Sequence, residues 1–365
     1  MSGLPSSQLQ VTLEKRPTGV PQEGQELVFQ PAAPMPTVKP GRVLLRNLVM
    51  SLDPAMRTQM SIRTYVEPVP LGTVMRAQTV SEVVEDGGGL KRGTLVTAPG
   101  GWQEYYAAHP KELQPVDVPA DLPLSSALGV LGGTGLTAYF GLLRVGQPKA
   151  GETVLVSGAA GATGNVVCQI AKHVVGCKVV GIAGGADKCR WLVDSLGLDA
   201  AIDYKAVGSG AGLNKAILEH CPKGVDVYFD NVGGDMLNQA LRRMRLFGRI
   251  VMCGAISGYN MIGGEDKRVD IKAQYAAAIV SQRVRLQGFI ITDYVKEFGA
   301  GKRELAEWIR QGKIRNQETV VEGLQHAGAA FRGLFEGVNI GKLIVKISDA
   351  RESKPSVTMP PSSKL

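Results

Sequence analysis

The sequence of 365 residues lacks any apolar stretch that approaches the length of a membrane-spanning helix. Its N-terminus also lacks the basic start and apolar run of a secretory signal, so we expect neither a membrane span nor secretion. Cysteine is scarce, and its odd count without paired short spacings fits free thiols in a reducing compartment. The five residues are Cys168, Cys177, Cys189, Cys221 and Cys253.

Dense blocks of basic residues are also missing, although the formal net charge is +8. The Lys and Arg residues are scattered along the chain, which indicates a general surface property and a field that favours an anionic cofactor. The run RRMR at residues 242–245 falls on a predicted helix, and we interpret it as a solvated face and not as a nucleic-acid site. A mass of 38.7 kDa with 44% hydrophobic residues predicts a globular protein with two sizeable cores.

Metal ligands are sparse in the first part of the chain. No cysteine precedes Cys168, and His109 is the one histidine before it. A catalytic zinc needs about three protein ligands and a structural zinc about four, commonly cysteines. We therefore expect no metal centre.

One stretch has the order strand, glycine turn, helix, strand. Thr153–Ser157 is a short β-branched run typical of a buried parallel strand. The segment GAAGATG (158–164) follows at once, residues 162–175 carry apolar side chains at helical spacing, and Lys178–Ala183 is a second β-branched run. Such a unit brings the N–H groups of a helix N-terminus to the pyrophosphate of a dinucleotide. A glycine triplet also occurs in structural turns, but the strand and helix around it favour the dinucleotide site.

The end of the second strand distinguishes the two nicotinamide dinucleotides. A site for NAD usually has Asp or Glu there, which accepts hydrogen bonds from the adenosine ribose. This chain has Ala183, Gly184 and Gly185 instead, and Lys188 follows as a cation able to pair with a 2′-phosphate. The alternative is a solvated lysine in the first turn of a helix, where the helix dipole mildly disfavours a cation. We predict NADPH as the cofactor.

The rest of the chain predicts a domain of strands followed by a doubly wound domain. Residues 1 to about 125 contain short apolar runs and no helix of normal length, with the proline-rich residues 31–40 as a turn or edge. A helix at 135–145 begins the second part. Six β-branched runs separated by helical segments then predict a parallel sheet covered by helices. These runs are Thr153–Ser157, Lys178–Ala183, Ala200–Asp203, Val225–Asp230, 249–253 and 285–291.

The C-terminal part predicts two more helices, at 295–311 and 328–336, and a final strand at 342–347. We expect this strand to return to the first domain and not to extend the parallel sheet. The predicted domains are residues 1–130, completed by about 315–348, and residues 131–314, with a flexible tail at 349–365.

Several separate motifs then identify a resemblance. They are SLDPAMR (51–57), GLTAYFGL (135–142), GAAGATG (158–164), VYFDNVGG (227–234), CGAISGYN (253–260) and NIGK (339–342). Over residues 10–347 the chain resembles the zinc-independent medium-chain dehydrogenase/reductases, in the group of prostaglandin reductases, leukotriene dehydrogenases and alkenal double-bond reductases. The resemblance implies an α/β fold, with a GroES-like β-barrel domain beside a Rossmann-type doubly wound cofactor domain, and a homodimer. Residues 71–74 read LGTV where a zinc enzyme of the superfamily would show Gly-His-Glu.

The resemblance also implies the residues that bind the cofactor. The glycine turn would lie at the pyrophosphate, and Lys188 and Tyr204 would bind the 2′-phosphate, in agreement with the charge argument. The implied set is Gly161, Ala162, Thr163, Gly164, Lys188, Tyr204, Asn231, Cys253, Gly254, Ala255, Ile256, Ser257, Tyr259, Phe289, Ile290, Ile291 and Asn339. The chain departs from the family at Ala55, where similar proteins often have tyrosine, and this change bears on the shape and polarity of the substrate pocket.

The chemistry expected without a metal is reduction of a C=C bond conjugated to a carbonyl. Hydride from NADPH adds to the β-carbon, and hydrogen-bond donors can hold the enolate that results. We assign this hydrogen bond or proton path to Tyr259, because cofactor sites lie after the carboxyl ends of such strands. The alternative is a tyrosine that only packs on the cofactor. Tyr65 and Trp102 are candidates for the substrate pocket, although Tyr65 fits a buried position in the β domain equally well.

Two other functions remain compatible with the sequence. Quinone reduction uses the same hydride and the same lack of metal. A crystallin-like or NADPH-sensing protein would keep the fold and the cofactor without turnover.

The last three residues, Ser363, Lys364 and Leu365, match the peroxisomal address. They follow a polar, proline-containing tail that would leave them accessible to an import receptor. A chance terminal tripeptide is the alternative. We expect a peroxisomal protein.

Overall fold

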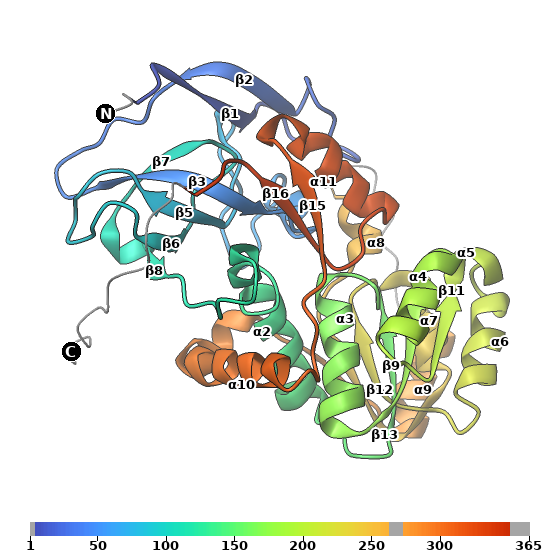
Figure 1. The fold of residues 1–365 in the computed structure, drawn as a ribbon. Helices are drawn as coiled ribbons and strands as arrows, with labels where there is room; N and C mark the ends of the chain where they lie inside the picture. The colour runs from blue at the N-terminus through green and yellow to red at the C-terminus, as the bar shows by residue number, and fades with distance from the viewer. Residues whose placement is uncertain (1–3, 263–272, 351–365) are drawn as a thin grey trace.

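The computed structural model describes residues 4–262 and 273–350, which form a domain of mainly antiparallel strands and a domain built on a parallel sheet (Figure 1). We call the first the β domain. Its small sheet has the order β2-β1-β4, and its large sheet has the order β15-β16-β3-β5-β6-β8, with β7 paired to β3. The strands are β1 (Ser7–Leu13), β2 (Leu27–Pro34), β3 (Val43–Ser51), β4 (Thr73–Val74), β5 (Thr79–Val83), β6 (Leu95–Ala98), β7 (Tyr105–Ala108), β8 (Gln114–Pro115), β15 (Glu318–Glu322) and β16 (Lys342–Lys346).

The second domain, called here the parallel-sheet domain, has six strands in the order β11-β10-β9-β12-β13-β14. Every neighbouring pair is parallel. This is the strand order of the doubly wound dinucleotide-binding fold, with the change of direction between β9 and β12. The predicted fold class is therefore confirmed. The strands are β9 (Thr153–Ser157), β10 (Lys178–Ala183), β11 (Ala200–Asp203), β12 (Val225–Asp230), β13 (Met244–Met252) and β14 (Arg285–Gly288).

Helices cover both faces of the parallel sheet. The helices are α2 (Gly133–Phe140), α3 (Ala162–Gln169), α4 (Ala186–Arg190), α5 (Tyr204–Val207), α6 (Ala211–His220), α7 (Gly234–Leu241), α9 (Ala273–Gln282) and α10 (Phe298–Arg310). Helix α3 continues with wider turns over Ile170–Val175, so the predicted helix at 162–175 is present in full. None of the helices in the described part of the chain is long and apolar enough to cross a membrane.

The C-terminal chain returns to the β domain, as the sequence predicts. Strand β16 pairs antiparallel with β3, and helix α11 (Ala327–Glu336) connects the parallel strands β15 and β16. Figure 1 shows this red segment crossing back over the earlier strands. The predicted edge at residues 31–40 begins within β2, which is the outer strand of the small sheet.

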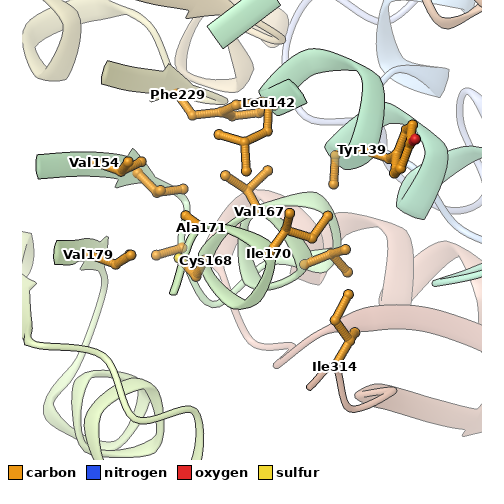
Figure 2. Packing of buried hydrophobic residues seen from close by; sticks show 14 of the residues in the cluster. Tyr139, Leu142, Val154, Val167, Cys168, Ile170, Ala171, Val179, Phe229 and Ile314 are labelled. Atoms are coloured by element: carbon orange, nitrogen blue, oxygen red, sulfur yellow. The ribbon is translucent and has the colours of Figure 1, made fainter. Parts of the chain in front are cut away.

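The core of the parallel-sheet domain follows from alternation along its strands. Val154 and Val156 point into the core cluster on one face of the sheet, whereas Leu155 points into the cluster on the other face. Figure 2 shows the first cluster, to which α3 contributes Val167 and its continuation contributes Ile170. Each such side chain contributes about 1.5–3 kcal/mol when it is fully buried, so the sheet and α3 hold each other in place.

The structure corrects three predictions of local structure. The run at 242–245 is not helical, because α7 ends at Leu241 and β13 begins at Met244. A bulge hides this strand in the sequence: its pairing with β12 shifts register, and Phe247 adopts a φ of 60° with an exposed ring. The predicted strand at 285–291 ends at Gly288. The helix predicted at 295–311 begins as α10 at Phe298, after a 3-10 segment.

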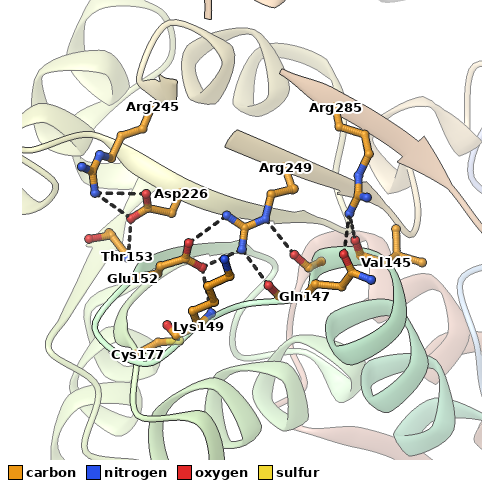
Figure 3. A network of polar contacts seen from close by, with 11 residues as sticks. Val145, Gln147, Lys149, Glu152, Thr153, Cys177, Asp226, Arg245, Arg249 and Arg285 are labelled. Atoms are coloured by element: carbon orange, nitrogen blue, oxygen red, sulfur yellow. Dashed lines mark hydrogen bonds and ion pairs between the residues drawn. The ribbon is translucent and has the colours of Figure 1, made fainter. Parts of the chain in front are cut away.

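A network of arginines joins the strands at the amino-terminal edge of this sheet (Figure 3). Arg249 donates from Nη1 and Nη2 to the two carboxylate oxygens of Glu152, at 3.0 and 2.6 Å. It also donates to the backbone oxygens of Gly146 and Gln147. Arg245 forms an ion pair with Asp226 at 3.0 Å, so this part of the basic run is paired with an acid of the neighbouring strand β12. The network ties the loop before β9 to β13.

Glu152→Gln is expected to lower the free energy of unfolding by about 2 kcal/mol at neutral pH, because the partly buried Arg249 loses its charged partner. Burial alone would raise the pKa of Glu152, but the bonds from Arg249 and from the Lys149 N–H outweigh it and lower this pKa. The contribution is therefore complete above the ordinary pKa of 4.5 and is lost as the pH falls through the folded-state value.

Urea unfolding of both proteins at neutral pH and near the folded-state pKa measures this difference. Wild type and variant should converge in stability on acidification. An equal gap at both pH values would contradict the role given to the carboxylate.

Candidate functional site

A cavity of about 630 Å³ lies between the two domains. On one side it is bounded by the carboxyl ends of β9, β10, β12 and β13, which is where open parallel sheets bind ligands. On the other side it is bounded by residues of the β domain that follow β3 and α11. Most of the predicted cofactor residues line it: Gly161, Ala162, Thr163, Gly164, Lys188, Tyr204, Asn231, Cys253, Gly254, Ile256, Ser257, Tyr259 and Asn339.

The glycine turn presents backbone donors to this cavity. Gly158 has a φ of 57°, and Gly161 precedes the first residue of α3 without any side-chain cap on the helix. The first N–H groups of α3 have no partners within the helix, and the positive end of its dipole points the same way. The connection between α11 and β16 closes the turn from the other domain, because the Gly341 N–H donates to the Ala160 oxygen at 2.8 Å.

Gly164→Ala is expected to disrupt this turn. An added Cβ would lie 2.2 Å from the carbonyl oxygen of Gly158, and backbone has to move to admit it. We expect the dissociation constant of NADPH to rise about tenfold or more, since the shift of backbone would misalign several N–H donors of the glycine turn at once. Fluorescence titration of NADPH measures the effect. Gly133→Ala is the control, because no atom lies within 4 Å of a Cβ added there; equal losses in both variants would contradict the assignment.

The end of β10 carries no acid, and the carboxylate beside it on the neighbouring strand is already engaged. Asp203, at the end of β11, accepts from the N–H groups of Gly185 and Lys205 at 2.8 and 3.0 Å. The ring of Tyr204 lies against Gly184, where a Cβ would be 2.8 Å from a ring carbon. Glycine at this position therefore admits the tyrosine ring to the cavity wall.

Two lysines and a tyrosine form a cationic corner at this end of the cavity, made of Lys188, Tyr204 and Lys205. The Lys188 Nζ donates to the carbonyl oxygen of Gly337 at 2.6 Å and forms no ion pair with the residues that the structure describes. Burial lowers the pKa of Lys188, and the nearby positive charge of Lys205 lowers it further. An anion bound in the corner would oppose both effects, because its negative charge favours the protonated ammonium. The sequence analysis missed Lys205; its position directly after Tyr204 is the signal that would have found it.

A buried carboxylate shapes the loops in the middle of the cavity. Asp230, at the end of β12, is fully buried, and its Oδ1 accepts from the Ser157 and Tyr228 hydroxyls at 2.8 Å. The same oxygen accepts from the N–H groups of Val232 and Gly233 at 3.0 and 2.9 Å. Burial raises the pKa of Asp230, and these hydrogen bonds oppose the rise. Sequence reasoning did not single out Asp230, although it lies within the VYFDNVGG motif.

Tyr259 also lines the cavity, on the short helix α8 (Ile256–Tyr259). Its hydroxyl accepts from the Ala255 N–H at 3.2 Å, and the bond leaves the phenolic hydrogen available to a ligand. Burial raises the pKa of Tyr259, so the phenol keeps its proton at neutral pH. The turn also carries Cys253, whose thiol pKa burial raises to about 12.

Tyr65 lies near Tyr259 without lining the cavity, and its side chain is 61% exposed. Partial desolvation of its hydroxyl raises its pKa, and the carboxylate of Asp53, which lines the cavity, adds to the effect. Ala55 also lines the cavity, next to Pro54. Its methyl group leaves open the space that a larger side chain would fill.

Several predicted residues are not brought to the cavity. Trp102 is fully buried in the β domain, with its ring edge to face against Phe331 at 5.7 Å, so it is a core residue and not part of a pocket. Phe289 packs on the core cluster of the parallel-sheet domain, because β14 ends one residue earlier and the chain turns there. Ala255, Ile290 and Ile291 are also absent from the lining.

Among the residues that the structure describes, no group of three or more His, Cys, Asp or Glu side chains is arranged to hold a metal ion.

Comparison with known proteins gives the family. A model described as the N-terminal domain of oxidoreductase matches residues 9–116, and one described as zinc-binding dehydrogenase matches residues 162–307. The chain is 44% identical over 345 residues to the putative NADP-dependent oxidoreductase YfmJ of Bacillus subtilis (strain 168), covering 94% of this chain and 99% of that protein. It is 42% identical over 320 residues to prostaglandin reductase 1 of Bos taurus, covering 86% and 91%. The chain belongs to the zinc-independent group of the medium-chain dehydrogenase/reductases.

A solved structure has the same fold. CurA from Vibrio vulnificus, in complex with NADPH, superimposes with a TM-score of 0.85 at 38% identity, covering 93% of this chain and 99% of that chain. The similarity spans both domains, so the cavity of the present reductase lies between the same two parts of the fold.

Proposed function

We propose that this protein is an NADPH-dependent reductase of the C=C bond of α,β-unsaturated aldehydes and ketones, and that it works without a metal ion. The observation that carries the proposal is the cavity itself, whose lining brings together a cationic corner, a glycine turn and a tyrosine. Relatives named as NADP-dependent oxidoreductase and prostaglandin reductase, and a neighbour solved with NADPH, support it.

The residues present fit NADPH. The cationic corner would hold the 2′-phosphate, because the partner of the Lys188 ammonium in the described part of the chain is a carbonyl oxygen, and a second lysine lies beside it. The backbone donors of the glycine turn would hold the pyrophosphate, and a Cβ at Gly161 would lie 3.1 Å from the Gly158 oxygen. The segment from Cys253 to Tyr259, with Asn231 and Asn339, would line the rest of the site.

When bound, NADPH supplies a hydride to the electron-poor β-carbon of the substrate, which leaves negative charge on the carbonyl oxygen. Tyr259 would donate a hydrogen bond from its protonated phenol to that oxygen, since burial raises its pKa. A proton that comes from water would then add to the α-carbon and complete the reduction. The buried Asp230 holds the neighbouring loop without facing the substrate, because its Oδ1 is fully engaged by four donors. Tyr65 would form part of the mouth of the substrate pocket.

Steady-state oxidation of NADPH with 2-nonenal, a conjugated ketone and a quinone, in parallel, tests the proposal. We expect turnover with the alkenal and the ketone and little with the quinone. Turnover with the quinone alone would favour quinone reduction, and NADPH binding without turnover of any substrate would favour a non-catalytic binding protein. NADH should be a poor substitute, because it has no 2′-phosphate for the corner.

We also propose a homodimer. Strand β14 is the outer strand of the parallel sheet, and its residues Arg285, Gln287 and Gly288 are exposed. Apolar side chains are exposed in the neighbouring segments, with Phe247 at 62% and Val280 at 78%. Pairing of two such edges would satisfy the free backbone groups and cover apolar surface. Light scattering during size-exclusion chromatography should give about twice the mass of 38.7 kDa; a monomer over micromolar concentrations would contradict the proposal.

Import into peroxisomes is a further proposal. It rests on the match of Ser363, Lys364 and Leu365 to the peroxisomal address, and these residues lie outside the described part of the chain. A fluorescent protein fused to the N-terminus should co-localise with a peroxisomal marker, and removal of Leu365 should disperse it. Diffuse fluorescence from the intact fusion would contradict the proposal.

A further inference from the structure

Arg57 is a buried cation whose direct contacts, among residues 4–262 and 273–350, are to uncharged groups. Its side chain is fully buried at the start of α1 (Met56–Gln59), two residues after Ala55 in the cavity wall. The Nε donates to the Gly19 oxygen at 2.9 Å, and Nη1 donates to the Ser61 hydroxyl at 2.8 Å. Nη2 donates to two carbonyl oxygens, of Pro17 and Ile262, each at 2.9 Å.

Burial of a guanidinium is costly when none of the described carboxylates contacts it, and burial lowers the pKa of Arg57 to about 10, with a partly opposing effect from Glu26. The group therefore stays charged at neutral pH. Charge-assisted bonds to carbonyl oxygens repay part of the cost, and the fork geometry lets one side chain hold several backbone segments at once.

One of the four partners belongs to a different wall of the cavity. Ile262 lies three residues after Tyr259, beyond the turn that ends α8, whereas Pro17, Gly19 and Ser61 belong to the β domain. The bond from Arg57 to Ile262 therefore joins the wall formed after β3 to the segment that carries Tyr259. Figure 1 shows α8 between the two domains, so a hydrogen bond from Arg57 can connect the segment after α8 to the β domain.

The start of the same segment has its own anchors within the parallel-sheet domain. The N–H groups of Cys253 and Gly254 donate to the backbone carbonyl oxygen of Asp230, at 2.9 and 3.0 Å. The Ser257 N–H and hydroxyl both donate to the Val232 oxygen, at 3.2 and 2.6 Å. The part of the segment that lines the cofactor region is thus held without Arg57, and the end beyond Tyr259 is held by it.

We infer that Arg57 is a positioning residue for the reduction: it fixes the far end of the Tyr259 segment against the β domain and so sets the hydroxyl of Tyr259 over the substrate. This role rests on the proposed function of Tyr259. The inference predicts different effects on catalysis and on cofactor binding. Loss of Arg57 should misplace Tyr259, whereas the hydrogen bonds that hold the cofactor-lining residues should remain.

Arg57→Lys tests the inference, with Arg16→Lys as the matched control. Arg16 is a half-buried arginine whose Nη1 also donates to two backbone oxygens, of Met60 and Val69, at 2.5 and 2.6 Å, but both lie in the β domain. We expect kcat for the conjugated ketone to fall about tenfold or more in Arg57→Lys, since small misplacements of a reacting group are costly. KM for NADPH should change by less than about twofold. Arg16→Lys should keep both values within about twofold of wild type.

A second readout does not depend on turnover. Hydrogen exchange of the protein without ligand should show faster exchange at residues 258–262 in Arg57→Lys than in Arg16→Lys, with residues 253–257 unchanged. Arg57→Ala should lose still more kcat and recover part of it in added guanidinium at millimolar concentration. If that variant does not fold, the lysine pair decides the question alone.

The outcomes separate the inference from the proposed function. A wild-type protein that binds NADPH without reducing any conjugated carbonyl would remove the proposed function. Given wild-type turnover, equal kcat in Arg57→Lys and Arg16→Lys would overturn the role of Arg57. A rise in KM for NADPH as large as the fall in kcat, or unchanged exchange at residues 258–262, would do the same.

Discussion

Lys188→Met is expected to raise KM for NADPH by about 10- to 100-fold and to leave KM for NADH within about twofold. The variant removes a charge-assisted bond to the 2′-phosphate, and hydrogen bonds to charged groups contribute about 1.5–3 kcal/mol. NADH has no phosphate at that position, so it loses nothing. The methionine keeps the length and the apolar body of the lysine, which isolates the effect of the charge.

The matched control is Lys215→Met on helix α6. Lys215 is 78% exposed and lies 3.9 Å from Glu219 on the same helix, outside the cavity lining. Its replacement should leave both KM values unchanged. The binding of 2′,5′-ADP, which carries only the adenine end of the cofactor, should weaken in Lys188→Met by the same factor as NADPH. An equal rise in KM for NADPH and NADH would show that Lys188 does not read the phosphate.

Tyr259→Phe is expected to lower kcat for a conjugated ketone by about 100-fold or more, because loss of one donor at a developing oxyanion costs about 2.7–4 kcal/mol. KM for NADPH should stay within about threefold, since the ring still packs in the cavity. Tyr106→Phe, in strand β7 of the β domain, is the control for loss of a phenolic hydroxyl away from the cavity. An unchanged kcat in Tyr259→Phe would remove the tyrosine from the chemistry.

The pH dependence gives an independent check of the same residue. Burial raises the pKa of Tyr259 above its ordinary value of 10.0, so the donor should persist through neutral and mildly alkaline pH. Wild-type kcat should fall only where the phenol loses its proton, above pH 10. The residual rate of Tyr259→Phe should lack this alkaline fall, because no phenol remains to titrate. The same alkaline limb in both proteins would assign it to another group.

The sequence was most informative where one chemical requirement decides the residue. The glycine turn and the absence of an acid after β10 are local features, and parallel β9 and β10 place them at the same edge of the sheet. The return of the final strand to the β domain was also predicted, although its partner β3 lies far back in the chain. The glycine turn and the missing acid could be recognised without knowledge of distant contacts.

The parts that were missed depend on contacts between distant residues. The buried position of Trp102 follows from its packing on Phe331, which is far away in the chain. Asp230 looks like an ordinary polar residue until four donors converge on one of its oxygens. Arg57 is equally ordinary in a sequence, and its link to Ile262 spans 205 residues. Patterns within one segment carry no signal for such contacts.

The bulge in β13 shows a third kind of failure. Strand prediction relies on alternation, and the exposed residues Leu246 and Phe247 interrupt it within the strand. The basic run at 242–245 was therefore interpreted as the solvated face of a helix. A register shift of this kind is visible only in the pairing with β12.

The most direct test of the central claim follows the hydride. Protein treated with a strong chelator is mixed with NADPH carrying deuterium at the transferable position of the nicotinamide, together with a conjugated ketone in ordinary water. NMR of the product should show one deuterium at the β-carbon, hydrogen from water at the α-carbon, an intact carbonyl group and an undiminished rate. Deuterium on the former carbonyl carbon, or activity that returns only when zinc is added, would contradict metal-free reduction of the double bond.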